Sequence, residues 1–148
     1  MEINGLPLHP LVVHAAVVFG PLAALSALAY LVPAWRDRLR WPTVVLVLLA
    51  FVSIWAAFLS GESFRDDPRF DAAAGVFLER LEHHEEVAET LRLVITGFTV
   101  VTLAAAFLHE RKGPLRILLG VLVAAGAIGT IVYVVMTGDA GSQAVYGQ

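Results

Sequence analysis

Residues 42–61 read PTVVLVLLAFVSIWAAFLSG, an uncharged run that decides the fold class. The run has the length of about 20 residues that a helix needs to cross the hydrocarbon core of a bilayer. Three more uncharged runs accompany it, at Leu11–Trp35, Leu93–Leu108 and Ile117–Gly138. Hydrophobic residues make up 58% of the 148 residues, too many for a soluble domain of this size. We therefore predict an all-α integral membrane protein that lies in the lipid bilayer.

The four runs predict a single domain over residues 1–148, a transmembrane four-helix bundle. The expected helices cover residues 10–34, 42–60, 72–110 and 114–137. The first run is too long for a secretory signal peptide and no basic residue precedes it, so we expect a retained helix. The chain has no cysteine, which excludes disulfides, thiolate metal sites and iron–sulfur clusters within it.

The basic residues predict the orientation. Three arginines lie within Arg36–Arg40, and the gap between the third and fourth runs carries Arg111, Lys112 and Arg116. Short basic loops mark the cytoplasmic side, so we expect a multi-pass protein of the bacterial cytoplasmic (inner) membrane. Both termini and the acidic segment 62–89, which begins with a turn-rich stretch over 60–68, should face outward. The net charge of −3 gives no indication of a nucleic-acid partner.

The two halves of the chain resemble each other. Histidines open each half, as His9 and His14 in the first and His83 and His84 in the second. Each half closes with a hydroxyl residue, a glycine and an acid, in Ser60-Gly61-Glu62 and in Thr137-Gly138-Asp139. A duplicated helical hairpin would relate the halves by a pseudo-twofold axis along the membrane normal. Duplication and chance similarity both remain open at this point.

Such a duplication would gather histidines and carboxylates around one axis at the outer face. Two imidazoles can ligate haem iron, and histidines with carboxylates can hold iron, copper or zinc. His14 lies within the first membrane turns, where an unpaired polar ring is costly, so it is either a ligand or an interfacial residue bonded to a carbonyl or a headgroup. His9 precedes Pro10, so it is either a helix cap or a metal ligand.

In the second half, His84 is better placed than His83, because it shares a helical stripe with Arg92. Arg92 lies about two turns further on and would neutralise a haem propionate, pair with a carboxylate or reach the outer headgroups. The predicted haem site consists of His14, His84 and Arg92. The predicted metal site consists of His9, His14, His84, Glu62 and Asp139. His109 has no histidine at its depth and is not included.

The opening Gly5-Leu6-Pro7-Leu8-His9-Pro10-Leu11-Val12-Val13-His14 resembles a bacterial four-helix membrane family, domain of unknown function 2231. That family opens with Gly-x-Pro-Leu-His-Pro-Leu-x-Val-His, which carries over to His9 and His14, and has a further histidine before its third helix. Many relatives have histidine where Asp139 stands here. Some members are fused to Rieske-type iron–sulfur domains, so the resemblance implies a link to electron transfer and is compatible with haem b.

Three functions from different classes follow. The first is a cytochrome-like protein with one haem b near the outer face, ligated by His14 and His84, acting in membrane electron transfer. The second is a mononuclear iron, copper or zinc site for metal handling. The third is a cofactor-free accessory subunit of a membrane complex. Partners considered are a respiratory or redox complex and a second copy of the chain. No nucleophile–base pair, P-loop or dinucleotide fingerprint points to an enzyme.

Overall fold

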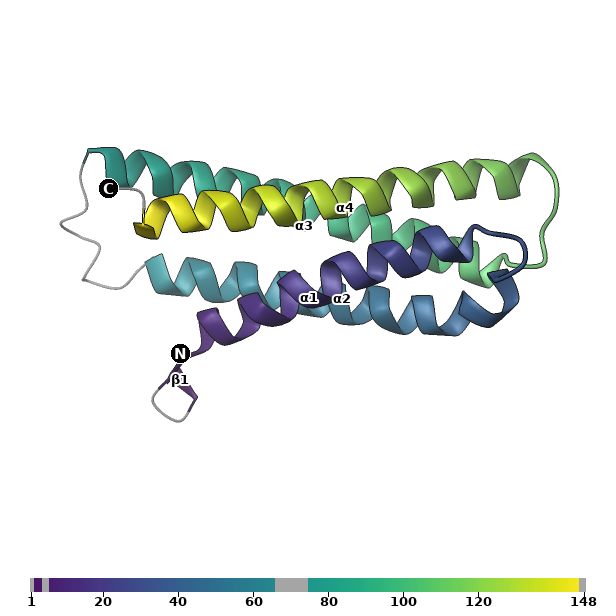
Figure 1. Cartoon of the computed structure of the whole chain (residues 1–148), viewed down its shortest axis with the longest axis horizontal. Coiled ribbons are helices and arrows are strands. Elements are labelled where there is room, and N and C mark those ends of the chain that lie inside the picture. The colour runs from purple at the N-terminus through teal and green to yellow at the C-terminus, as the bar shows by residue number, and fades with distance from the viewer. Residues whose placement is uncertain (1, 4–5, 66–74, 147–148) are drawn as a thin grey trace.

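The computed structural model describes residues 2–3, 6–65 and 75–146, and its architecture is a four-helix bundle (Figure 1). Two short strands, β1 (Glu2–Ile3) and β2 (Leu6–Pro7), pair antiparallel ahead of the bundle. The helices are α1 (Leu8–Tyr30), α2 (Arg36–Arg65), α3 (Val76–Phe107) and α4 (Pro114–Tyr146). All four are long and apolar enough to cross a membrane. The turn-rich stretch predicted over 60–68 is wrong for residues 60–65, which continue α2 to Arg65, and residues 66–68 lie outside the described residues.

The helix ends differ from the expected ranges for physical reasons. α1 stops at Tyr30, and Pro33, which lacks a backbone N–H and disfavours the helical conformation in the residue before it, follows in the connection. α2 begins at Arg36 and α4 continues to Tyr146, both well beyond their uncharged runs. Charged and polar residues such as arginine and glutamine are good helix formers, so the helices continue outside the segments that suit the hydrocarbon core.

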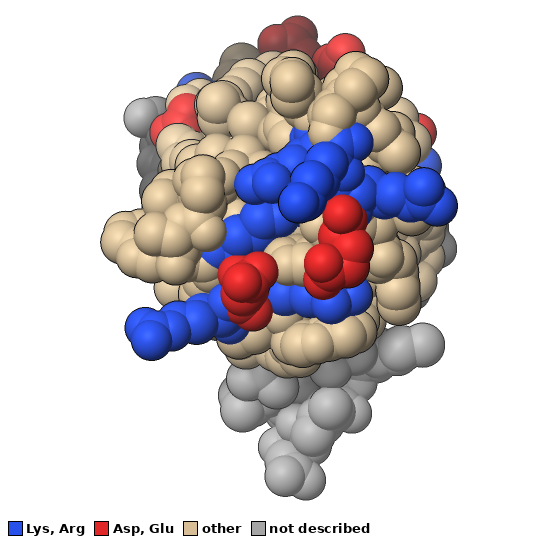
Figure 2. Space-filling model, turned by 90° about the vertical axis from the view of Figure 1, so that its right-hand side faces the viewer, with Lys and Arg blue, Asp and Glu red and all other residues tan. Residues whose placement is uncertain are grey.

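The helices run up and down in turn, and each packs mainly against two neighbours. α1 contacts α2 and α4, while α3 contacts α4 and α2. At one end, the terminal end, α1 and α3 begin and α2 and α4 finish (Figure 1). At the other, the basic end, the connections 31–35 and 108–113 join the helices of each hairpin. Figure 2 looks onto the basic end and shows Lys and Arg side chains across it.

Small residues let the helices approach closely in the core. Ala23, Ala24, Ala27, Ala50 and Ala127 are all fully buried, and the large Tyr30 and Phe98 fill the remaining space. Some buried hydroxyls are satisfied locally: Thr99 and Thr130 each donate to the carbonyl four residues earlier. Many leucine, valine and isoleucine side chains cover the outside of the bundle. A protein that is apolar both inside and outside suits a lipid environment.

The two hairpins bury many equivalent positions, which supports the duplication considered from the sequence. Buried positions of α1 recur in α3 75 residues later: Ala16, Gly20, Ala23, Ala24, Ala27 and Tyr30 match Leu91, Ile95, Phe98, Thr99, Thr102 and Ala105. Those of α2 recur in α4 80 residues later: Thr43, Val47, Ala50, Ile54 and Ser60 match Val123, Ala127, Thr130, Val134 and Ala140. The hairpins therefore pack in one shared register.

Three helices are longer than a bilayer is thick. α2, α3 and α4 have 30, 32 and 33 residues, which at about 1.5 Å per residue gives about 45–50 Å. The hydrocarbon core measures about 30 Å. Trp35 and Trp41, 54% and 55% exposed, lie at the basic end, where aromatic rings mark the interface. Counted from Trp41, about 20 residues of α2 cross the hydrocarbon core and reach its opposite boundary near Gly61. The terminal end of the bundle therefore lies at this boundary and beyond it.

Candidate functional site

A cavity of about 1270 Å³ lies between the two hairpins at the terminal end. All four helices line it. Its apolar wall includes Val13, Ile54, Leu91 and Val134, and its polar residues include His9, Glu62, His84 and Arg92. The cavity is therefore apolar toward the core of the bundle and carries titratable groups toward the terminal end. An apolar wall with a few polar groups is common in small-molecule sites.

His9 is fixed by the last turns of α2. Its Nδ1 lies 3.1 Å from the carbonyl oxygen of Ala57 and 3.0 Å from the hydroxyl oxygen of Ser60. A carbonyl only accepts, so Nδ1 carries the proton, and Nε2 is the basic nitrogen of the neutral ring. Gly61 makes room for the ring, because a Cβ there would lie 3.2 Å from Cε1 of His9. The contacts set both the orientation and the tautomer of His9.

His84 is held in the same way by α4. Its Nδ1 donates to the carbonyl oxygen of Thr137 at 3.1 Å. A Cβ added at Gly141 would lie 3.1 Å from Cε1 of His84, so glycine again provides the space for the ring. His84 stands 75 residues after His9, and Thr137 and Gly141 stand 80 residues after Ala57 and Gly61. These are the offsets that relate the buried positions, so the two histidine sites are equivalent.

This equivalence corrects the repeat inferred from sequence. The sequence comparison matched Ser60-Gly61-Glu62 to Thr137-Gly138-Asp139. In the structure the residue equivalent to Gly61 is Gly141, three residues beyond Gly138 in α4, because each of the two glycines packs against its histidine. The similarity of the two tripeptides therefore does not reflect the register of the hairpins. What the halves share is a histidine, a backbone carbonyl and a glycine four residues after that carbonyl.

Arg92 is the cation of the cavity. Its guanidinium lies 5.1 Å from the centre of the Trp55 ring and 4.4 Å from that of Phe58. One nitrogen donates to Glu89 at 3.3 Å, while its buried Nε has no hydrogen-bond partner among the residues that the structure describes. Aromatic rings hold such a group by cation–π attraction. Arg92 is thus positioned with hydrogen-bonding capacity left for an anionic group.

The other predicted residues are arranged differently. His14 is exposed and does not line the cavity with His84. Glu62 lines the cavity but is largely exposed. Asp139 is exposed and accepts a hydrogen bond from Gln143 at 2.7 Å. Within residues 2–3, 6–65 and 75–146, no three histidine, aspartate or glutamate side chains gather closely enough to hold a metal ion.

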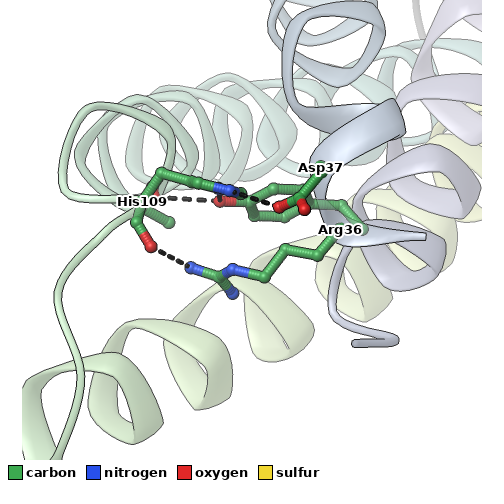
Figure 3. Close-up of polar contacts among 5 residues, drawn as sticks. Arg36, Asp37 and His109 are labelled. Atoms are coloured by element: carbon green, nitrogen blue, oxygen red, sulfur yellow. Dashed lines mark hydrogen bonds and ion pairs between the residues drawn. The ribbon is translucent and has the colours of Figure 1, made fainter. Parts of the chain in front are cut away.

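A second polar cluster, at the basic end, involves a histidine that the sequence reasoning set aside (Figure 3). The Tyr30 hydroxyl donates to the Ala105 carbonyl at 3.0 Å and lies 3.0 Å from Nδ1 of His109. Nε2 of His109 lies 2.8 Å from Asp37. Arg36 donates to the His109 carbonyl at 3.4 Å and stacks over the Tyr30 ring. These contacts join α1, α2 and the end of α3.

The sequence contained one signal for this cluster. Asp37 is the only acid between the arginines of residues 36–40, and Tyr30 lies near the end of the first uncharged run. Neither residue is a histidine, so the criterion of a histidine partner at the same depth did not select His109. Tyr30 and His109 are 1% and 9% exposed, whereas the Asp37 side chain is 92% exposed. The arrangement fits a structural tie between helices rather than a ligand site, since its polar groups already bond one another.

His9 should make the stability of the ligand-free protein depend on pH. Burial lowers the pKa of His9 below its ordinary 6.5, the hydrogen bond to Ala57 opposes the shift, and the charge of His84 adds to it. The folded state therefore favours the neutral ring. This stabilisation is complete above about pH 6.5 and is lost as the pH falls through the lowered pKa. We expect the thermal unfolding midpoint to fall on acidification from about pH 7.5 to about pH 5.5.

The variant His9→Gln separates this effect from other titrations. Glu62 of α2 and His84 of α3 line the same cavity and remain in the variant. His9→Gln should therefore show a smaller fall in the unfolding midpoint over the same pH range. An equal fall in both proteins would assign the acid sensitivity to the other groups.

The family described as Predicted membrane protein (DUF2231) matches residues 5–148. This is the family that the opening motif resembles, and the match spans nearly the whole chain. No curated protein and no solved structure matches the chain.

Proposed function

The chain belongs to the DUF2231 family of predicted membrane proteins, and we propose that it binds one haem b between its hairpins for membrane electron transfer. His9 and His84 are the proposed axial ligands. The observation that carries the proposal is the matched pair of imidazoles lining one cavity, each with its Nδ1–H held by a backbone carbonyl. Histidines that ligate metals commonly donate their second nitrogen in this way, which fixes the orientation and the tautomer of the ring.

His9 takes the place of His14 in this proposal for a geometric reason. His14 is exposed and lies outside the lining of the cavity, whereas His9 lines it with His84. Burial also lowers the pKa of His9, and a neutral imidazole is the form that binds a metal. Two histidines suffice for haem, so the proposal does not require a third protein ligand.

The other residues of the cavity suit the same group. Val13, Ile54 and Leu91 provide an apolar wall that excludes water from a porphyrin. Arg92 offers its unpaired Nε and its guanidinium to a propionate. When bound, haem supplies one-electron chemistry, and the chain sets the iron potential through ligand choice and burial.

Two alternatives remain as outcomes of the test. A mononuclear metal site is less well supported, because the described side chains form no cluster of three suitable ligands. A cofactor-free accessory subunit would use the exposed acidic residues of α3, such as Glu79, Glu82 and Glu86, to dock a partner complex.

The basic end is inferred to face the cytoplasm, because positive loops remain on that side. The cavity then opens toward the outer face.

The test is an absorption spectrum and a metal analysis of the detergent-purified protein, before and after titration with haemin. The proposal expects one haem per chain and the spectrum of a low-spin, six-coordinate iron. Stoichiometric metal without porphyrin bands would support the mononuclear site instead. A protein that contains neither group and does not bind haemin would overturn the proposal in favour of the accessory subunit.

A further inference from the structure

The cluster around His109 at the basic end holds three short polar contacts in a row (Figure 3). The Tyr30 hydroxyl oxygen lies 3.0 Å from the Ala105 carbonyl oxygen and 3.0 Å from Nδ1 of His109. Nε2 of the same ring lies 2.8 Å from a carboxylate oxygen of Asp37. Each contact is a hydrogen bond only if one of its two atoms carries a hydrogen. The Ala105 carbonyl and the carboxylate carry none, so Tyr30 and His109 must supply all three hydrogens.

The single hydroxyl hydrogen of Tyr30 belongs to the Ala105 carbonyl. Ala105 lies in the last turn of α3, where the carbonyls have no helical N–H partner. Tyr30 is 1% exposed, so its hydroxyl has no solvent to turn to. Turning the hydroxyl toward Nδ1 would leave the carbonyl against a bare oxygen 3.0 Å away. His109 therefore supplies the other two hydrogens, one on each ring nitrogen, and such a ring is an imidazolium.

The surroundings of the ring suit a positive charge. The His109 side chain is 8% exposed, and a buried charge is tolerated where it is paired and hydrogen-bonded. Asp37 provides the opposite charge at 2.8 Å, within the roughly 2.7–2.9 Å of a charge-assisted hydrogen bond. The Asp37 side chain is 92% exposed, so water solvates its carboxylate form. His109 also follows the C-terminal end of α3, where the helix dipole favours a cation.

The other charged residues at this end carry both signs. Arg36 of α2 donates to the His109 carbonyl oxygen at 3.4 Å, and its guanidinium lies 4.8 Å from the centre of the Tyr30 ring. Its positive charge opposes a charge on the ring of His109. The remaining charged residues of α2, the connection 108–113 and α4 near this end are Arg38, Arg40, Glu110, Arg111, Lys112 and Arg116. Within the described ranges, Asp37 is the one carboxylate that forms an ion pair with His109, so the charge of the ring depends on Asp37.

We propose that His109 is an imidazolium whose two N–H groups tie the two hairpins together at the basic end in a pH-dependent manner. Tyr30 and Asp37 belong to the first hairpin and His109 to the second. Loss of one ring proton leaves one of the three contacts without a hydrogen and removes the attraction to Asp37. The tie is therefore complete at mildly acidic pH and weakens as the pH rises. This dependence is opposite in sign to that of His9, and it requires no ligand in the cavity.

NMR of protein isotopically labelled at its histidine nitrogens tests the charge directly, and His109→Asn identifies the signals of His109. At about pH 7, we expect two protonated ring nitrogens at His109 in detergent micelles. Asp37→Asn keeps an oxygen acceptor but removes the charge, so the ratio of doubly to singly protonated rings should fall about fivefold. The matched control Glu110→Gln removes the same charge from an exposed neighbour of His109 and should leave the ratio nearly unchanged. One bare nitrogen at His109 in the unmodified protein would overturn the proposal.

Unfolding midpoints test the pH dependence. Asp37→Asn should lower the thermal unfolding midpoint most at about pH 6, and its difference from the unmodified protein should shrink toward about pH 9. Both proteins keep the histidines of the cavity, so the acid sensitivity of the cavity cancels in this difference. A difference that stays constant over this range, or that equals the effect of Glu110→Gln, would contradict a pH-dependent tie. If Asp37→Asn fails to fold, Tyr30→Phe takes its place: it removes the acceptor of Nδ1 and should likewise lower the fraction of doubly protonated His109 at about pH 7.

Discussion

Replacing His9 or His84 with alanine is expected to abolish stoichiometric haem binding, whereas replacing His14 or His83 is not. Each of the first two changes removes one proposed axial ligand from the cavity. Removing an outer hydrogen-bond partner lowers the affinity of a metal site about 10–100-fold. Removing a proposed ligand should lower the affinity for haem by more than this. His14 and His83 are exposed, so their alanine variants are matched controls of the same residue type. The measurement is a haemin titration followed by the absorption spectrum.

A smaller effect is expected when only the support of a ligand is removed. Ser60→Ala deletes one hydrogen-bond partner of His9 but keeps the Ala57 carbonyl, so haem should remain bound with reduced affinity. Unfolding midpoints of all variants show whether the bundle is intact. If His14→Ala lost haem while His9→Ala kept it, the ligand assignment would be wrong although the haem proposal itself would survive.

Gly126→Ala should destabilise the bundle more than any other glycine-to-alanine substitution in the core. A Cβ at this position would lie 2.8 Å from Cδ2, 3.0 Å from Cβ and 3.1 Å from Cα of Phe98. The last of these atoms is backbone, so α4 must move away from α3. Overpacking of this kind costs about 1–3 kcal/mol. We expect the variant to unfold at a lower fraction of sodium dodecyl sulfate in mixed micelles than the unmodified protein.

Gly97→Ala is the control for this change. Gly97 lies in α3, and apart from its chain neighbours and the adjacent helix backbone no described atom lies within 4 Å of the position its Cβ would take. The methyl group there should leave the stability unchanged or raise it slightly, since alanine favours a helix over glycine. If the two variants unfolded at the same detergent fraction, the close approach of α3 and α4 at Gly126 would be disproved.

The sequence predicts the fold well because the bilayer imposes a simple rule. Uncharged runs of about 20 residues must be helical to satisfy their backbone hydrogen bonds, and the structure has four such helices. The family suggested by residues 5–14 is also confirmed. The helix ends are less predictable, because an uncharged run indicates where lipid surrounds a helix and not where the helix stops. α4 accordingly continues to Tyr146.

The candidate site is only partly predictable. His84 and Arg92 were singled out from sequence and both line the cavity, but His14 was preferred to His9 as the partner of His84. Five residues of helix turn a side chain by about 140°, so His9 and His14 cannot both face the cavity. Which of them does so depends on how α1 packs against α2, and the hydrophobicity of the run does not reveal that.

The shared register of the two hairpins shows where the two halves differ in the cavity. Val17 and Arg92 occupy equivalent positions, 75 residues apart, and both line the cavity. One side of the cavity thus presents a hydrocarbon and the other a cation. If the proposed haem lies between the two equivalent imidazoles, its propionates would favour the side of the cavity that carries Arg92, so this one residue would give the bound group a preferred orientation.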